Sequence, residues 1–368
     1  MRIAAFNVEN LFERARIMNL DTWDEGRQVL ERVTALSDLL EKVVYSDADK
    51  SRILTLHAEL GLKDSDTGPF VTLKRNRGAL VTRRKNGTVE ITADGRGDWI
   101  GWVELRRGPV NETAMMNTGR VIRDVNADIL GVVEAEDRTS LQRFSEEVIA
   151  MVGGAPYPRI MLIDGNDQRG IDVGLMVKDG YSIGAMRSHV HDGGASPIFS
   201  RDCPEYAVTC PDGTVIWVLV NHFKSKGFGR AADNDRRRKA QSAAVAGYYA
   251  RLRSEGFANV VVLGDLNDTP GSDPISPLLA TDLREVSDFA GFDTGEFAGR
   301  GTYGLGNDSN KIDYILLSPA LFARITAAGI FRMGAWPGTR PKRWEVYEEL
   351  EREVHAASDH HAIWVDLA

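Results

Sequence analysis

The chain has 368 residues, of which 43% are hydrophobic, so it can bury a sizeable core in one large α/β domain or in two smaller ones. Its 45 basic and 53 acidic residues give a formal charge of −8, which argues against a globally basic nucleic-acid-binding protein. A polyanion would have to be met by a local basic patch or by metal ions. The only cysteines, Cys203 and Cys210, allow one disulfide but neither a disulfide framework nor a zinc pattern.

The sequence lacks the pattern of a targeting or membrane segment. The first residues do not combine the basic start, long apolar stretch and cleavage site of a signal peptide. No apolar run approaches the roughly 18 residues that a membrane helix needs. These features predict a cytoplasmic protein without membrane contact, unless a leader has been removed, and they leave the oligomeric state open.

The first hundred residues begin with a strand and then change in texture. Residues 2–8 form a short apolar run, typical of a buried strand, that ends at Asn7 and Glu9. From Asp24 to Val44, apolar residues recur at helical spacing, which predicts an amphipathic helix. Residues 70–107 contain short β-prone runs separated by turn signals, which predict a small antiparallel meander.

This expected meander contains a dense run of positive charge. Residues 74–85 contain six basic residues and no acidic one, namely Lys74, Arg75, Arg77, Arg83, Arg84 and Lys85. A run of this kind is most often a solvated face. The alternative is contact with a phosphate backbone.

The rest of the chain alternates expected helices and strands, and strand after strand delivers polar groups to its end. Helices are expected near residues 112–126 and from the basic cluster at Arg236 to about Arg253. Strands are expected within residues 127–137, 169–177, 214–227, 259–268, 311–319 and 357–367. With the first strand, the polar residues collected in this way are Asn7, Glu9, Glu134, Asp172, Asn221, His222, Lys224, Asp265, Asn267, Asp313, Asp359 and His360. The glycine-rich stretch 291–310 is expected to be a loop near them.

Taken singly, these residues have simpler explanations, because Asp and Asn commonly form turns and a lone buried histidine is usually a satisfied core residue. Repetition over seven strands favours a shared site. Carboxylates and amides without clustered cysteines favour a hard cation, Mg²⁺ or Mn²⁺, over zinc. The two histidines and the spare carboxylates would then supply acid and base groups.

Several of these segments together resemble one family. FNVEN, DILGVVE, RGIDVGLM, NHFKSKG, GDLND, KIDYILLS and SDH are similar, in order and rough spacing, to motifs of the endonuclease/exonuclease/phosphatase superfamily, and most of all to its bacterial nuclease-like branch. The resemblance implies an α/β fold, a four-layer α-β-β-α sandwich of two mixed sheets. It implies a single domain over residues 1–368, interrupted after the first strand by an insertion, residues 13–120, of helix and meander.

The resemblance also implies roles for the strand-end residues. Glu134 would be the main metal ligand, with Asn7 and Asp359 close to the metal and Glu9 a weaker candidate. Asp265 would orient or deprotonate the attacking water, and Asn267 would hold a phosphate oxygen. Two histidine–carboxylate pairs are implied, His360 with Asp313 and His222 with Asp172. Candidates for contact with substrate phosphate are Asn221, Lys224, Lys74, Arg75, Arg77, Arg83, Arg84 and Lys85.

The function predicted in this way is Mg²⁺- or Mn²⁺-dependent hydrolysis of phosphodiesters in DNA or RNA, by in-line attack of water. One alternative is the same chemistry on a small phosphate ester, such as an inositol phosphate or a phospholipid headgroup, which the charge of −8 favours. Another is a catalytically inactive binding scaffold. The presence of the complete set of metal-binding and histidine positions argues against a scaffold.

Overall fold

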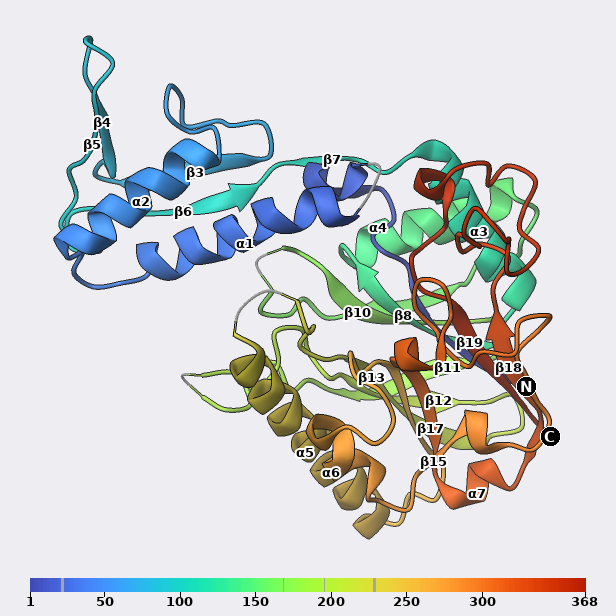
Figure 1. The fold of residues 1–368 in the computed structure, drawn as a ribbon. Helices are drawn as coiled ribbons and strands as arrows, with labels where there is room; N and C mark the ends of the chain where they lie inside the picture. Colours follow the sequence, from blue (N-terminus) through green and yellow to red (C-terminus); the bar gives the residue numbers. More distant parts are fainter. Residues whose placement is uncertain (21–22, 168, 195, 228–229) are drawn as a thin grey trace. The chain divides into compact units, whose positions relative to one another are not determined.

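A computed structural model describes residues 1–20, 23–167, 169–194, 196–227 and 230–368 (Figure 1). The chain divides into two compact units, which we call the sandwich unit (Met1–Phe12 and Val110–Ala368) and the inserted unit (Glu13–Pro109). Within the described residues, no helix has the length and apolar character needed to span a membrane.

The sandwich unit contains two mixed sheets. The first has seven strands in the order β16-β18-β19-β1-β8-β10-β9, and the second has six in the order β11-β12-β13-β14-β17-β15. In the first sheet β1 pairs in parallel with β8, and in the second β13 pairs in parallel with β14. The strands of the first sheet are β1 (Arg2–Asn7), β8 (Ile129–Ala135), β9 (Arg159–Leu162), β10 (Asp172–Val177), β16 (Phe292–Asp293), β18 (Ile325–Phe331) and β19 (Ala362–Leu367). Those of the second are β11 (Ser182–Arg187), β12 (Glu205–Thr209), β13 (Val215–His222), β14 (Val260–Asp265), β15 (Arg284–Glu285) and β17 (Asp313–Leu317).

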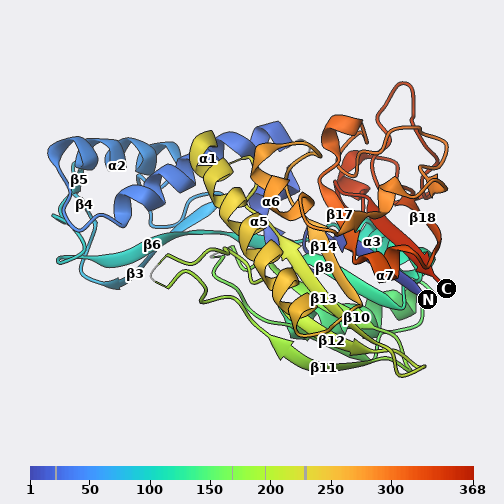
Figure 2. The ribbon, with the colours of Figure 1, turned by 90° about the horizontal axis from the view of Figure 1, so that it is seen from below.

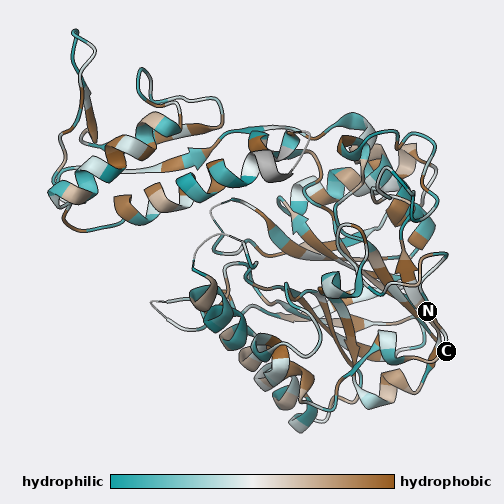
Figure 3. Ribbon diagram, viewed as in Figure 1, coloured by the Kyte–Doolittle hydropathy of each residue, from teal (hydrophilic) through white to brown (hydrophobic). Residues whose placement is uncertain are grey.

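The two sheets pack face to face because their strands carry apolar side chains on both faces. In β14, Val261 and Leu263 belong to the core cluster between the sheets, whereas Val260 and Val262 belong to the cluster beneath the helices. Side chains alternate between the faces of a strand, so a continuous apolar run is what a strand buried on both faces requires. Figure 3 shows the apolar character of these strands.

Helices cover the outer face of each sheet. Val121, Ile122 and Val125 of α3 pack in one cluster with β1 and β8, whereas Val245 and Tyr249 of α5 pack in another with β13 and β14. Figure 2 shows α5 crossing the outer side of the second sheet. The helices of this unit are α3 (Glu112–Val125), α4 (Arg138–Arg143, followed by a π-helical turn), α5 (Ala231–Ser254), α6 (Ser276–Leu279) and α7 (Pro319–Phe322). The predicted four-layer sandwich of two mixed sheets is therefore confirmed.

The inserted unit has its own core. Leu36 and Leu40 of α1 (Trp23–Leu40) and Ile53 and Leu56 of α2 (Asp47–Glu59) pack there against the buried Trp99. The strands form three separate two-stranded pairs, β2 (Glu13–Ala15) with β7 (Arg107–Pro109), β3 (Val71–Arg77) with β6 (Ile100–Leu105) and β4 (Val81–Arg83) with β5 (Val89–Ile91).

The structure differs from the sequence-based expectations in four features and settles one possibility that the sequence left open. The helix expected to reach Val44 ends at Leu40, and Val43 and Val44 are exposed. The meander is replaced by separate strand pairs, and α2 was not predicted. The inserted unit ends at Pro109 rather than near residue 120, because α3 packs into the core of the sandwich unit. Cys203 and Cys210 are both free and buried, so the one disulfide that the sequence allowed is not formed.

Candidate active site

Strand parity delivers four of the predicted residues to the same edge of the sandwich. In β14, Val261 and Leu263 face the space between the sheets, so Asp265, two residues further on, continues that side. The same spacing places Asn7 at the end of β1, His222 at the end of β13 and Asp313 at the start of β17. All four are at most 3% exposed. The inter-sheet faces of four strands therefore end in polar groups.

Glu134 reaches this region through a β-bulge. In the pairing of β8 with β10, Asp172 lies opposite Ala135 and Val173 opposite Val133, so Glu134 is the extra residue of the bulge. Its φ of 64° lies in the left-handed region, which non-glycine residues rarely adopt. Glu9 and Asn267 also have positive φ, at 50° and 52°. Strained backbone at three strand ends is typical of a functional site.

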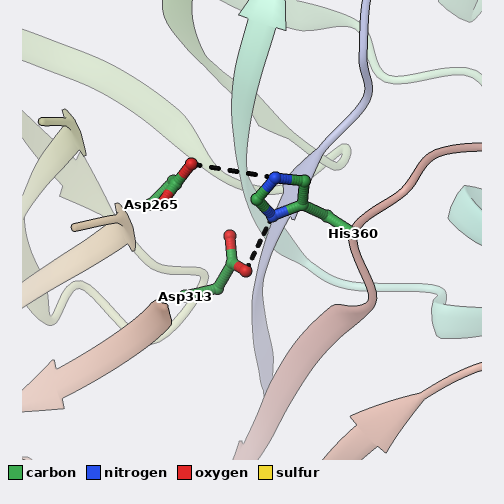
Figure 4. Close-up of side chains that lie close together, drawn as sticks. All are labelled: Asp265, Asp313 and His360. Carbon is green, nitrogen blue, oxygen red and sulfur yellow. Dashed lines mark hydrogen bonds and ion pairs between the residues drawn. The ribbon is translucent and has the colours of Figure 1, made fainter. Parts of the chain in front are cut away.

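Asp265, Asp313 and His360 form the best-defined group of the site (Figure 4). Each offers one ligand atom, and these atoms all lie within 4.8 Å of one another, so the group could hold a metal ion. His360 Nδ1 lies 2.8 Å from Asp313 Oδ2, which is hydrogen-bonding distance, and His360 Nε2 lies 3.8 Å from Asp265 Oδ2. The expected pairing of His360 with Asp313 is thus present in the structure. Because Asp313 already satisfies Nδ1, we interpret the group as a histidine–carboxylate pair facing a second carboxylate.

Asp265 stands between the two histidines. Its Oδ2 lies 3.6 Å from His222 Nε2 and 3.4 Å from the amide nitrogen of Asn7. The backbone N–H and side-chain amide of Asn267 both donate to Asp265, at 2.8 and 3.1 Å. The Asn267 amide also donates to the carbonyl of Phe223, so in this structure it positions Asp265 and does not point a free N–H at a phosphate.

The residues predicted as metal ligands lie beside this group. Glu134 Oε1 lies 3.6 Å from His222 Nε2, and Asp359 Oδ1 lies 3.8 Å from His360 Nε2. Glu9 Oε2 accepts the backbone N–H of Asp359 at 3.2 Å. Asn7 Oδ1 accepts the backbone N–H of Glu9, so the amide group of Asn7 turns its nitrogen toward Asp265 and His360.

The two histidines are driven toward opposite protonation states. Burial disfavours charge on His360, but the carboxylates of Asp313, Asp359 and Asp265 outweigh it and hold its pKa well above the usual range. Burial, followed by Arg201, holds the pKa of His222 well below that range. Burial, followed by the Asp313 carboxylate, raises the pKa of Asp265 to about 8. Neighbouring groups whose pKa values are pushed apart are typical of acid–base sites.

Two arginines of a cationic cluster near His222 were missed at the level of sequence. The guanidinium of Arg201, 1% exposed, places Nη2 3.2 Å from His222 Nε2. Asp167 lies between Arg201 and Arg169, with Oδ2 3.2 Å from Arg201 Nε and 2.8 Å from Arg169 Nη2. Burial, followed by these two arginines, lowers the pKa of Lys224 to about 8. Arg169 opens the RGIDVGLM segment, whereas Arg201 lies in a loop without periodic pattern, so no local signal identifies it.

Two predicted residues do not make the contacts expected of them. Asp172 precedes Val173, which faces the inter-sheet core, and its Oδ1 accepts the backbone N–H of Gly165 at 2.8 Å. Within the described residues His222 Nδ1 has no hydrogen-bond partner, so the expected pairing of His222 with Asp172 is not formed. Asn221 is fully buried and donates to the carbonyl of Leu219, which does not fit a contact with substrate phosphate.

The six basic residues of the expected phosphate-contacting run all lie in the inserted unit. Three have carboxylate partners there, Lys74 with Glu104, Arg83 with Asp66 and Arg84 with Glu90. The side chains of the other three, Arg75, Arg77 and Lys85, are exposed and have no ion-pair or hydrogen-bond partner within the described part of the chain.

Comparison with known proteins places the chain in a family. Among solved structures, the chain is similar to the mannosyl-6-phosphatase Bt3783 of Bacteroides thetaiotaomicron, with 16% identity, a TM-score of 0.51 and coverage of 70% of this chain and 91% of that one. It is also similar to an endonuclease/exonuclease/phosphatase family protein of the same species, with 17% identity, a TM-score of 0.50 and coverage of 69% and 86%. At such low identity these similarities support the fold alone.

No curated protein matches the sequence significantly. The family model for the endonuclease/exonuclease/phosphatase family matches residues 109–331, which is more than half of the chain. The chain therefore belongs to the endonuclease/exonuclease/phosphatase family, whose members are hydrolytic phosphoesterases.

Proposed function

We propose that the protein is a divalent-metal-dependent phosphodiesterase that cleaves nucleic acid. One observation carries the proposal: a single carboxylate oxygen, Asp265 Oδ2, lies within 3.8 Å of Nε2 of both His222 and His360. Hydrolysis of a phosphodiester needs a group that orients and accepts a proton from water, together with groups that stabilise charge on the phosphoryl and leaving oxygens. The arrangement around Asp265 offers both.

In this proposal Asp265 orients and deprotonates the attacking water. Asn267 fixes the carboxylate through two donated hydrogen bonds, which leaves it little freedom to rotate. His360, fixed by Asp313, presents Nε2 to the reacting phosphate and stabilises the developing charge. Side chains on strand ends hold such a geometry better than loop residues do, and small displacements lower the rate of an oriented reaction.

The donor set fits a hard cation. Glu134 and Asp359 contribute carboxylates, with Glu9 beside Asp359, and Mg²⁺ and Mn²⁺ favour oxygen ligands of this kind. Burial raises the pKa of Glu134, and the nearby Asp359 carboxylate acts in the same direction, although Arg169 and Arg201 oppose it. A bound cation would offset the repulsion between the two carboxylates. When bound, a divalent cation supplies positive charge for the phosphoryl oxygens. Glu134 would be its main ligand, with Asp359, Asn7 and Glu9 nearby.

The missed cations supply a second source of positive charge. Arg201 and Arg169 lie around Asp167, and Arg201 contacts His222. A charge that is shielded from water acts more strongly on a nearby phosphate, because less water screens it. We assign Arg169 and Lys224, which are partly exposed, to recognition of the substrate phosphate, and the buried Arg201 to the positive charge of the site.

A small phosphate ester is the second candidate substrate. The formal charge of −8 favours it, since a polyanion is repelled by an acidic protein at long range. The inserted unit favours nucleic acid, because its unpaired basic side chains have no evident role in binding a small ester.

The experiment is hydrolysis by the wild type and His360→Ala with Mg²⁺ or Mn²⁺, on supercoiled DNA, single-stranded DNA, RNA and bis-p-nitrophenyl phosphate. His191→Ala is the matched control, since His191 is an exposed histidine outside the site. We expect nicking of nucleic acid that EDTA abolishes, that His360→Ala loses and that His191→Ala retains. Cleavage of the small diester alone would favour the second candidate, and inactivity on all four would contradict the proposal.

A further inference from the structure

The β3–β6 ribbon of the inserted unit has one buried face and one open face. Residues directly opposite each other in an antiparallel pair lie on the same face. The buried face includes Val71, Leu73 and Val103, which belong to the core of this unit. The other face carries three cross-strand pairs, Thr72 with Glu104, Lys74 with Trp102 and Arg77 with Ile100.

The open face exposes an aromatic ring. The Trp102 side chain is 44% exposed and Ile100 is 38% exposed, whereas Trp99 at the start of the same segment is fully buried. The Trp102 indole N–H donates to Glu104 Oε2 at 3.3 Å, which holds one edge of the ring on the ribbon. Tryptophan is enriched among the residues that carry most of the binding energy at interfaces.

The charges around this ring favour an anionic ligand. Glu104 Oε1 lies 3.6 Å from Lys74, so the one carboxylate of the open face has a basic partner there. Arg77 lies on the open face and Arg75 precedes it on the same strand, and both are exposed without a partner in the described residues. The local charge is therefore positive in a chain whose total charge is −8.

We propose that this open face, defined by Lys74, Arg77, Ile100 and Trp102, binds single-stranded nucleic acid, an inference that rests on the proposed nuclease function. An indole stacks on any unpaired base, and flanking arginines contact the backbone. In a duplex the faces of the bases are already stacked, so a single strand is favoured. Two exposed apolar side chains are too small a surface for a stable protein partner.

The test measures binding of the full-length protein to fluorescent oligo-deoxythymidine by anisotropy, in EDTA to prevent cleavage. Trp102→Ala should weaken binding about 10-fold, and Trp102→Phe should restore most of the affinity because a phenyl ring still stacks. Arg77→Gln should reduce the slope of log K against log salt by about 0.7, the value for one lost contact with a single strand. Arg52→Gln is the control, since it removes one exposed charge from α2.

Separate readouts distinguish this inference from the proposed function. Trp102→Ala and Arg77→Gln should leave hydrolysis of bis-p-nitrophenyl phosphate unchanged, because neither residue belongs to the candidate active site. The inference would be overturned if Trp102→Ala bound the oligonucleotide with the affinity of the wild type, or if Arg77→Gln and Arg52→Gln reduced the salt dependence equally. Nuclease activity of the wild type would still support the proposed function in either case. Self-association in solution that Trp102→Ala abolishes would assign the open face to a second copy of the chain and likewise overturn it.

Discussion

Replacing Asp313 by asparagine tests whether this residue acts through His360. Asp313→Asn keeps the size of the side chain but removes the charge 2.8 Å from His360 Nδ1. The backbone N–H of Asp313 donates to Thr302 Oγ1 at 2.9 Å, which should keep the main chain in place. The substitution should therefore change the electrostatics of His360 more than its position.

The expected loss can be worked from the separation of the charges. Two unit charges about 4 Å apart, at an effective dielectric constant near 20, attract each other by about 4 kcal/mol. If between half and all of this attraction stabilises the transition state, kcat/KM falls by about 30-fold to 1,000-fold, at about 1.4 kcal/mol per factor of ten. His360→Ala should lose about 100-fold to 10,000-fold, the range for a positioned acid–base group.

The assay is steady-state hydrolysis of bis-p-nitrophenyl phosphate by the wild type, both single variants and the double variant. If Asp313 acts only through His360, the double variant should be no slower than His360→Ala, because coupled residues are not additive. The free energy of unfolding should be measured alongside, since Asp313→Asn removes both the attraction of Asp313 to His360 and its repulsion of Asp265. Additive losses, or Asp313→Asn within threefold of the wild type, would refute the reasoning.

Two further predictions concern charge and pH. Burial lowers the pKa of Lys224 to about 8, so the KM of the wild type for a phosphodiester should rise above pH 8 as the ammonium group loses its proton. In Lys224→Met, KM should be about 10-fold higher at pH 7 and should no longer rise above pH 8. Measuring KM against pH for both proteins checks this. Burial, followed by Arg83, lowers the pKa of His57 to about 4. The unfolded state therefore binds the proton more tightly than the folded state, and the free energy of unfolding should fall by roughly 2–3 kcal/mol as the pH falls from 6.5 to 4. His57→Leu should remove most of that loss in urea unfolding followed across this pH range, whereas an unchanged pH dependence would contradict the assignment to His57.

The sandwich could be predicted from the sequence because its strands are buried on both faces. Val260, Val261, Val262 and Leu263 form a continuous apolar run, and the structure divides them alternately between two core clusters. Few other local structures require such a run, so element type and burial follow together. Gly131 shows a finer requirement, since a Cβ there would lie 2.2 Å from Leu263 Cδ1 of the facing sheet. That close approach could not be predicted, because it depends on which strands face each other.

The inserted unit was harder to predict because its signals are local and weak. The helix α2 buries only Ile53, Leu56 and His57, too few for a clear periodic pattern. Its N-terminal capping box, formed by Ser46 and Asp49, was the available signal. The β-prone runs were recognised, but turn signals do not determine which runs pair. As a result the strands of three separate pairs were predicted as one meander.

Strand parity explains which candidate residues reach the site and which do not. Asp265 keeps the parity of Leu263 and faces the space between the sheets, whereas Asp172 is one residue out of step with Val173 and accepts a hydrogen bond from Gly165 instead. Applied to the sequence, this alternation would have assigned Asp265 to the site and excluded Asp172. It would also have excluded Glu134, which enters the site only through its bulge and positive φ.

Arg201 marks the limit of reasoning from sequence at this site. Neither periodicity nor a strand end identifies it, and it becomes recognisable only when its guanidinium is seen beside His222 and Asp167. A fully buried cation is costly unless charges compensate it, and the carboxylate that Arg201 contacts, on Asp167, is shared with Arg169. Retaining such a group beside His222 is easier to explain by attraction of an anionic substrate than by stability. The same reasoning supports a phosphate as the group that this edge of the sandwich recognises.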